Sequence, residues 1–346
     1  MTTWAPVVRR HRRLQAVGLF VRLSALGTTL AVVLLGAASV SPALPWATAA
    51  VLVIVAVGFH VYFFVSNDVI DLPVDRLEPR RAVSPLVRGT ISRGAALAIA
   101  LGAVPVTLAV AGAGPGGARA WWALIVCFAL MTVYNLLNKR TSVPWLLDLV
   151  QGVGWAAFFL YGAATRGSWT PLTWWSAAFW VGFMVLANGV HGALRDVAND
   201  ARCGARTTAI AMGARADADG RVVLPRGVVA YAWALHVGLV AIVLGAWAFG
   251  DLGYGAVARG GTLVAVLGLG ATGAWALSAA AISDGDPEPL RLAGTLHLLL
   301  LMAMPVVLLL PWLATGFRLV VVVGFLAPLA ALGWLPDTVR WVRRCR

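Results

Sequence analysis

The sequence predicts an all-α integral membrane protein, and three observations lead to that prediction. Hydrophobic residues make up 60% of the 346 residues and only 12% are charged, whereas soluble domains average about 45–50% apolar and about 25% charged residues. The mean hydropathy is +0.85. The apolar residues also gather into segments close to the roughly 20 residues that a helix needs to span a bilayer.

Ten such segments follow one another along the chain, each bounded by residues that end helices. In order, the predicted spans are residues 17–40, 45–65, 93–112, 120–137, 143–163, 171–194, 227–249, 260–282, 291–313 and 316–335. The connections hold Ser41-Pro42, Gly114-Pro115-Gly116-Gly117, Pro144, Pro171, Pro225, Pro287, Pro289 and Pro336. The first apolar stretch is longer than the roughly 7–15 residues of a signal-peptide core, so we expect an uncleaved span.

We expect a single polytopic membrane domain over residues 1–346, built from four parts. Residues 1–16 form a basic N-terminus, and residues 17–140 and 141–282 form two four-helix halves. Residues 283–346 add two C-terminal helices and a basic tail. An acidic cluster follows the second span of each half, which indicates a parallel duplication with a site at the interface of the repeats.

Arginine is distributed unevenly between the two predicted sides of the membrane. With a cytoplasmic N-terminus and alternating spans, the outer loops hold only Arg119, Arg166, Arg259 and Arg318 of the 27 lysines and arginines. Arg22 lies inside the first span, and the others lie on the cytoplasmic side. Because cytoplasmic loops carry the excess of basic residues, we expect a multi-pass protein of the cell membrane with both termini in the cytoplasm. The net charge of +13 then reflects topology, and we expect no nucleic-acid partner.

Five of the 14 acidic residues lie in two short clusters at span ends, on the predicted cytoplasmic side. The first cluster contains Asn67, Asp68, Asp71 and Asp75, and the second contains Asp196 and Asp200. Spacings of three, four and seven residues place the side chains of a cluster on one helix face. Oxygen ligands without histidine or cysteine favour Mg²⁺, which usually takes one or two carboxylates together with substrate phosphates. The clusters therefore predict a Mg²⁺ site that is completed by a diphosphate.

Basic residues beside the clusters complement this chemistry, since cations stabilise the negative charge that develops on a diphosphate leaving group. Lys139 and Arg140 end the fourth span, Arg81 follows the first cluster and Arg206 follows the second. We expect most other arginines only to obey the positive-inside rule. The three cysteines, Cys127, Cys203 and Cys345, show no metal-binding spacing, so we expect free thiols.

Two polar residues inside spans are further candidates. Asp148 lies about one turn into the fifth span, where an ionisable group is costly and by default marks a functional site. It could instead sit at the interface and pair with Lys139. Asn188 precedes Asp196 on the sixth span, and we expect it to line a cavity or polarise an acceptor.

These motifs resemble those of the UbiA-type intramembrane prenyltransferase superfamily, over about residues 17–282. The matching residues are Asn67-Asp68-x-x-Asp71-x-x-x-Asp75, Asp196-x-x-x-Asp200 followed by Gly204 and Thr207, Tyr134-x-x-x-x-Lys139-Arg140, and Arg22 early in the first span. The resemblance implies a bundle of nine transmembrane helices, here with a tenth, and a central cavity capped by cytoplasmic motif loops. It also implies Mg²⁺, an isoprenoid diphosphate donor and an aromatic or other small acceptor.

The resemblance and the chemistry of the residues together assign roles to the candidates. Mg²⁺ is expected to bind Asp68, Asp71, Asp75, Asp196 and Asp200. The diphosphate is expected to contact Asn67, Arg81, Tyr134, Lys139, Arg140 and Arg206. The acceptor or the cavity is expected to involve Arg22, Asp148 and Asn188. Of these residues, Asp71, Asp75, Tyr134, Lys139, Asp196 and Asp200 are the predicted catalytic set.

Two alternatives stay open at this point. Leu23 after Arg22, and Ser84 before Pro85, depart from the family pattern, and these departures give weight to a terpene cyclase that ionises the same donor without an acceptor. A transporter would fit the many spans and the internal duplication. The carboxylates cluster at one side of the membrane and not at its midplane, which argues against transport.

Overall fold

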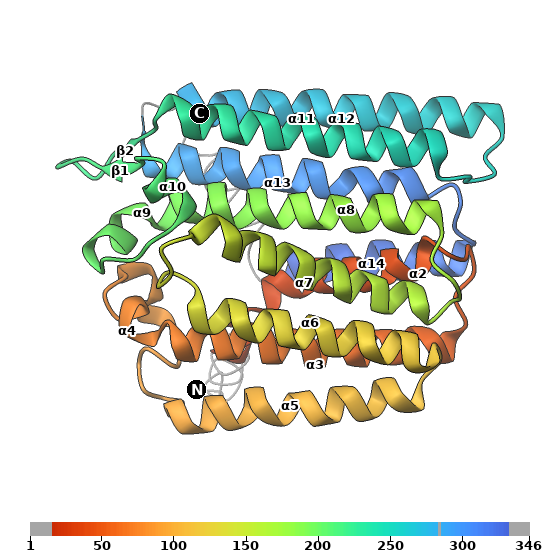
Figure 1. Ribbon diagram of the computed structural model, residues 1–346, viewed down its shortest axis with the longest axis horizontal. Coiled ribbons are helices and arrows are strands. Elements are labelled where there is room, and N and C mark those ends of the chain that lie inside the picture. Colours follow the sequence, from red (N-terminus) through yellow and green to blue (C-terminus); the bar gives the residue numbers. More distant parts are fainter. Residues whose placement is uncertain (1–15, 283–284, 332–346) are drawn as a thin grey trace, which may run out of the picture.

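The computed structural model of the chain describes residues 16–282 and 285–331, and these fold into a bundle of helices with one small hairpin (Figure 1). Eight helical segments are long and apolar enough to cross a membrane. They comprise α3 (Trp46–Ile70), α5 (Arg93–Ala113), α6 (Gly117–Leu137), α7 (Pro144–Ala164), α8 (Pro171–Leu186) with its continuation, α11 (Arg226–Phe249), α12 (Ala256–Ile282) and α13 (Pro287–Leu309). Two shorter apolar helices are α2 (Leu26–Ala38) and α14 (Thr315–Ala331). The predicted all-α, multi-pass membrane fold is confirmed.

The first predicted span is not one helix, which corrects the expectation of a continuous helix over residues 17–40. Residues 16–20 are helical, and the helix breaks at Arg22, whose φ of 47° and ψ of 47° are left-handed. The short 3₁₀ helix η1 (Leu23–Ala25) follows and leads into α2. A left-handed conformation is unfavourable for a residue other than glycine, and the ion pair that Arg22 forms with Asp68 offsets that cost. The apolar pattern around Arg22 gives no sign of this long-range partner.

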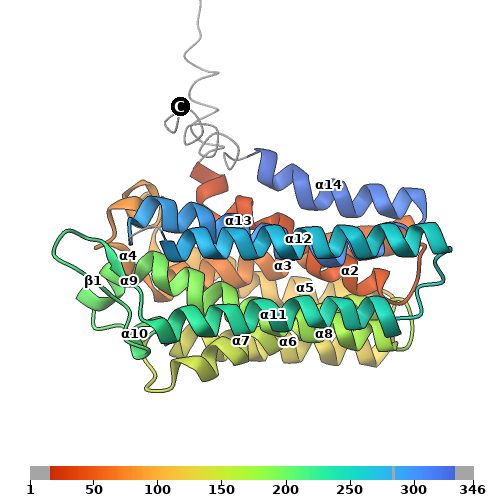
Figure 2. The same ribbon diagram turned by 90° about the horizontal axis from the view of Figure 1, so that it is seen from above.

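Helix α2 lies in the centre of the bundle and packs closely on α7. A Cβ atom on Gly162 would lie 2.1 Å from the carbonyl oxygen of Val33, and one on Gly36 would lie 2.1 Å from that of Phe159. The two backbones therefore touch directly, as small residues allow at helix interfaces in membranes. Figure 2 shows α14 on one face of the bundle, where it packs against α2.

The two acidic clusters lie at the same end of the bundle, on the left in Figure 1. Helix α3 leads there into α4 (Leu72–Asp75) and η2 (Pro79–Val83). Helix α8 continues through a π-helical segment, η3 (Ala187–Gly192), into α9 (Ala193–Arg202). Next come α10 (Thr208–Ala211) and a hairpin in which β1 (Arg215–Ala216) pairs antiparallel with β2 (Val222–Val223). Segments of π-helix often mark functional sites.

Two hydrogen bonds join the segments that carry the motifs. The Asn199 side-chain amide donates to the Val74 carbonyl at 3.3 Å, which ties α9 to α4. The Arg206 backbone N–H donates to the Lys139 carbonyl at 3.0 Å, which ties the loop after α9 to the loop after α6. The two motif regions therefore form one continuous cap over the end of the bundle.

Candidate functional site

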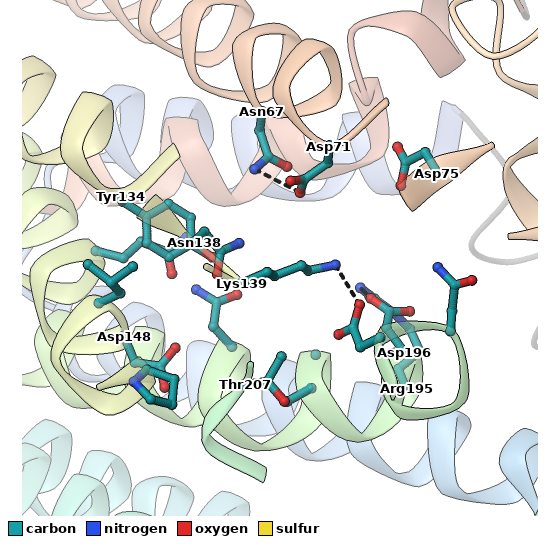
Figure 3. Close-up of a pocket in the computed structure, with 18 of the residues that line it drawn as sticks. Asn67, Asp71, Asp75, Tyr134, Asn138, Lys139, Asp148, Arg195, Asp196 and Thr207 are labelled. Carbon is teal, nitrogen blue, oxygen red and sulfur yellow. Dashed lines mark hydrogen bonds and ion pairs between the residues drawn. The ribbon is translucent and has the colours of Figure 1, made fainter. Parts of the chain in front are cut away.

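A cavity of about 150 Å³ lies beneath this cap, between α3, α6, α7 and the segment from η3 to α9 (Figure 3). Most of the predicted site residues line it: Arg22, Asn67, Asp71, Asp75, Arg81, Tyr134, Lys139, Asp148, Asn188, Asp196, Asp200 and Arg206. Asp68 and Arg140 do not belong to its lining. The structure thus brings together residues that are far apart in the sequence and that were selected by their chemistry or by the family resemblance.

The first cluster reaches the cavity from the end of α3 and from α4. Asp71 is the residue at which α3 ends, and Asp75 closes the single turn of α4 that follows. The Asn67 amide donates to Asp71 Oδ2 at 3.4 Å and to Asn135 Oδ1 at 3.3 Å. The buried Asn135 on α6 therefore fixes Asn67, and Asn67 orients the Asp71 carboxylate at the cavity wall.

Asp68 has a different environment from the other carboxylates of the cluster. It pairs with Arg22, and Arg81 approaches its Oδ1 at 3.8 Å. Arg81 also approaches Asp75 Oδ1 at 3.6 Å, so one guanidinium bridges both carboxylates. The pairing satisfies the charge of Asp68 without a metal ion, and its role as a ligand stays a prediction.

The second cluster faces the first across the cavity, and Lys139 extends between them (Figure 3). Lys139 lies just after α6 in a left-handed conformation with φ of 65°, and its Nζ donates to Asp200 Oδ1 at 2.9 Å. The other oxygen of Asp200, Oδ2, is buried and has no hydrogen-bond partner in the structure. Arg195 holds Asp196 by two bonds of 3.0 and 2.7 Å.

Burial and neighbouring charges shift the pKa values of three residues at the mouth of the cavity. Burial raises the pKa of Asp71 to about 6, an effect that Lys139 opposes and that Asp75 reinforces. Burial also raises the pKa of Asp75, against the opposing charge of Arg81. Burial alone would lower the pKa of Lys139, but Asp200 and Asp71 outweigh it and the net shift is upward. The nearby cations thus do not fully offset the burial of the Asp71 and Asp75 carboxylates. Lys139 remains a cation.

The donors present fit a hard divalent cation that shares its coordination with a substrate. Among the residues that the structure describes, no group of three or more histidine, cysteine, aspartate or glutamate side chains forms a metal site by itself. Asp71 and Asp75 line one wall of the cavity, and on the opposite wall Asp200 has an oxygen without a partner. Mg²⁺ usually keeps water and phosphate oxygens beside one or two carboxylates. Each wall therefore offers part of a coordination sphere, and the protein does not provide a closed cage.

The other polar residues of the cavity lie deeper, on α6, α7 and η3. Asp148 Oδ2 accepts a hydrogen bond from Thr208 Oγ1 at 2.5 Å, while Lys139 pairs with Asp200. The expected alternative of an Asp148–Lys139 pair is therefore not formed. Tyr134 and Asn188 also line the cavity.

Several lining residues were not predicted from the sequence, among them Asn138, Gln151 and Asn199. Gln151 follows Asp148 by three residues, so the two share a helix face, and that spacing would have identified it. Asn199 lies within the second acidic cluster, next to Asp200. Asn138 ends α6 immediately before Lys139, and no pattern distinguishes it from an ordinary helix-ending residue.

Comparisons with known proteins agree with this architecture. A family model described as the UbiA prenyltransferase family matches residues 25–293. An apo UbiA homolog from Aeropyrum pernix K1 is 21% identical with a TM-score of 0.59, covering 83% of this chain and 96% of that one. A UbiA homolog from Archaeoglobus fulgidus, bound to DMAPP and Mg²⁺, is 15% identical with a TM-score of 0.61, covering 84% of this chain and 98% of that one.

A third solved structure concerns digeranylgeranylglyceryl phosphate synthase in membranes. It is 14% identical to this chain with a TM-score of 0.59, and the match covers 90% of this chain and 98% of that one. No curated protein matches the sequence. Identities this low establish a shared fold, and the functional argument has to come from the residues of the site.

Proposed function

We propose a function from one premise: the chain belongs to the UbiA prenyltransferase family. It is a Mg²⁺-dependent intramembrane prenyltransferase that ionises an isoprenoid diphosphate and transfers the prenyl group to an aromatic or other small acceptor. The Archaeoglobus fulgidus homolog has been solved with DMAPP and with GPP, each together with Mg²⁺. The same class of donor suits the cavity of this chain, because its mouth carries carboxylates and cations, and aromatic side chains also line it.

The observation that carries the proposal is the pair of carboxylate clusters on opposite walls of one cavity. Asp71 and Asp75 on one wall, with Asp196 and Asp200 on the other, would hold Mg²⁺. When bound, Mg²⁺ supplies Lewis-acid stabilisation of the charge that develops on the diphosphate. Neither cluster alone offers enough ligands, and a diphosphate between them would complete both.

The cations of the site bind the diphosphate oxygens and stabilise the leaving group. Lys139 is 18% exposed at its side chain, and its ammonium group lies between the two walls. Arg81 and Arg206 also line the cavity. Fixed positive charge that faces the leaving oxygen in a partly dehydrated site acts mainly on the transition state, so these residues lower the barrier to C–O bond cleavage.

Aromatic side chains continue the cavity inward from the charged mouth. Phe63, Phe64 and Tyr134 line it, and the rings of Phe63 and Tyr134 lie 6.2 Å apart between centroids. An aromatic face attracts a cation through its quadrupole. The same side chains keep water away from an allylic cation, so the prenyl group survives until the acceptor captures it.

We also place the mouth of the cavity, with both termini, on the cytoplasmic side. The loops at the cavity end carry Arg76, Arg81 and Arg140, while the opposite end has few basic residues, and this bias is typical of the cytoplasmic face. The orientation can be tested in a cysteine-free background. A cysteine at Asp219 in the hairpin should resist an impermeant thiol reagent in intact cells, and a cysteine at Ser168 should react; the reverse pattern would contradict the orientation.

The activity can be tested directly with purified protein in nanodiscs. Prenyl diphosphates of several chain lengths are incubated with and without Mg²⁺, diphosphate release is measured, and the products are identified by mass spectrometry. Asp71→Asn should abolish release, and Asp219→Asn, a matched change at an exposed carboxylate of the hairpin, should not. Unchanged release by Asp71→Asn would refute the proposal. A cyclic product formed without an acceptor would indicate the terpene cyclase alternative.

A further inference from the structure

The cavity has a second polar region that the diphosphate chemistry does not use. Figure 3 places Tyr134 and Asp148 on one side of the cavity and Asp75 and Asp196 on the other. Lys139 and Arg195 are engaged with Asp200 and Asp196 at the charged mouth. Asp148 forms no ion pair with any residue that the structure describes. The cavity thus separates a charged mouth from an inner carboxylate without a cation.

Asp148 is buried but keeps one oxygen available. Its residue exposure is 7%, and Thr208 donates to Oδ2, whereas Oδ1 has no hydrogen-bond partner among the described residues. Gly189 on η3 makes this packing possible, since a Cβ atom there would lie 2.6 Å from Asp148 Oδ2. Thr208 on α10 therefore holds one oxygen of the carboxylate, η3 leaves space for it at Gly189, and Asp148 lines the cavity.

Two neighbours of Asp148 on the cavity wall carry buried polar atoms without partners. Gln151 is 4% exposed, and its Oε1 accepts no hydrogen bond from residues 16–282 or 285–331. Within the same residues, the Nδ2 of Asn188 donates none. Buried polar groups are nearly always paired, and an unpaired one destabilises the fold. One free acceptor and one free donor beside a free carboxylate oxygen indicate a ligand that both donates and accepts hydrogen bonds.

The geometry points to an acceptor site here, and the inference rests on the proposed prenyl transfer. We propose that Asp148, Gln151 and Asn188 bind an uncharged acceptor that carries a hydroxyl group, and that Asp148 receives the proton that this acceptor loses. A carboxylate-bearing acceptor would meet the negative charge of Asp148 in a partly dehydrated cavity, where like charges repel strongly. A neutral hydroxyl donates to Asp148 Oδ1 or Gln151 Oε1 and accepts from Asn188 Nδ2.

The transfer step balances with these groups. The C–O bond of the prenyl diphosphate breaks, and its electron pair leaves with the diphosphate. A new bond forms between the prenyl carbon and an oxygen or ring carbon of the acceptor. The acceptor's proton passes to the Asp148 carboxylate, which returns it to water after the product leaves. Nothing is oxidised or reduced, so no further co-reactant is required.

Acceptor selectivity tests the proposal. Wild-type protein, Asp148→Asn and the control Asp219→Asn are incubated with geranyl diphosphate, Mg²⁺ and one acceptor at a time. The acceptors are hydroquinone and aliphatic alcohols, each matched with an analogue in which a carboxylate replaces a hydroxyl. The readout is the turnover with the neutral acceptor divided by the turnover with its anionic analogue, measured within each variant. A general loss of activity lowers both values and cancels in this ratio. A wild-type preference for neutral acceptors that falls at least about tenfold in Asp148→Asn, but not in Asp219→Asn, is expected.

A second pair of variants keeps the test informative if Asp148→Asn folds poorly. Gln151→Met and Asn188→Leu should raise the KM for the neutral acceptor at least several-fold more than the KM for geranyl diphosphate. A selectivity ratio that is unchanged in Asp148→Asn, a wild-type preference for anionic acceptors, or diphosphate release without transfer to any acceptor would overturn the inference while leaving the ionisation chemistry intact. Absence of diphosphate release from every donor would overturn the proposed function itself, and this inference with it.

Discussion

Replacing Lys139 with methionine separates its structural role from its chemical role. Lys139 Nζ lies 2.9 Å from Asp200 Oδ1, and the side chains are 18% and 1% exposed. Removal of one member of a buried ion pair typically costs 3–5 kcal/mol, because the remaining charge loses its compensation. The Lys139 side chain is partly exposed, so we expect the lower end of this range, about 3 kcal/mol.

The chemical effect should be larger than this loss of stability explains. Loss of one preorganised charge that faces a leaving oxygen lowers kcat by about 10²–10³-fold, so Lys139→Met should slow diphosphate release by about that factor. Adding Asp200→Asn to Lys139→Met removes the uncompensated carboxylate and should restore most of the stability. It should not restore activity, because the double variant lacks both the ammonium group and the Asp200 carboxylate that is proposed to bind the metal.

Two assays on detergent-purified protein test this reasoning. Thermal unfolding measures the stability of the wild type, the single variants and the double variant, and Mg²⁺-dependent diphosphate release at saturating donor measures kcat. A Lys139→Met protein with the wild-type kcat would refute the assigned role in leaving-group stabilisation. A double variant that is no more stable than Lys139→Met would refute the view that Asp200 is the group left uncompensated.

Three further predictions follow from the site and the packing. Because the pKa of Asp71 is about 6, protons compete with Mg²⁺ for this carboxylate below pH 6 and not above it. Calorimetry should therefore show an Mg²⁺ affinity that falls by up to about tenfold per pH unit below pH 6. An affinity that stays constant from pH 5 to 7 would contradict this. Arg22→Ala leaves the buried Asp68 with only the more distant Arg81 as a partner and should lower the stability by about 3 kcal/mol. Asp68→Asn in the same protein should recover most of that loss; additive losses would contradict the pairing. Gly162→Ala forces α2 away from α7 and should lower the melting temperature by several degrees. Gly94→Ala is the control and should not lower it, because a Cβ atom there would meet no atom within 4 Å. Equal effects of the two changes would contradict the close packing.

The sequence predicted the helices and the meeting of the two acidic clusters, because both depend on local patterns. Hydrophobic length defines a membrane span wherever it occurs, and alternation of spans places both clusters at the same end. The spacing of Asp71 and Asp75, and that of Asp196 and Asp200, sets which helix face they share. These features require no knowledge of how distant helices pack.

The features that the sequence did not reveal all depend on contacts between distant segments. The break at Arg22 is stabilised by Asp68, 46 residues away, and the surrounding apolar pattern is that of an unbroken helix. Asp68 fits the spacing of its cluster but pairs with Arg22 and Arg81 and does not line the cavity. The burial of Gln151 Oε1 without a partner depends on how other segments pack around α7, and no local pattern in the sequence shows that packing.

The central claim is that carboxylates from both walls of the cavity hold one metal–diphosphate complex. Binding of Mn²⁺, measured by electron paramagnetic resonance with a non-ionisable thiolo analogue of geranyl diphosphate, tests it most directly. Wild-type protein should bind Mn²⁺ tightly only in the presence of the analogue, and Asp71→Asn and Asp200→Asn should each abolish that binding. Undiminished Mn²⁺ binding in either variant would contradict the claim, because one wall alone would then hold the metal.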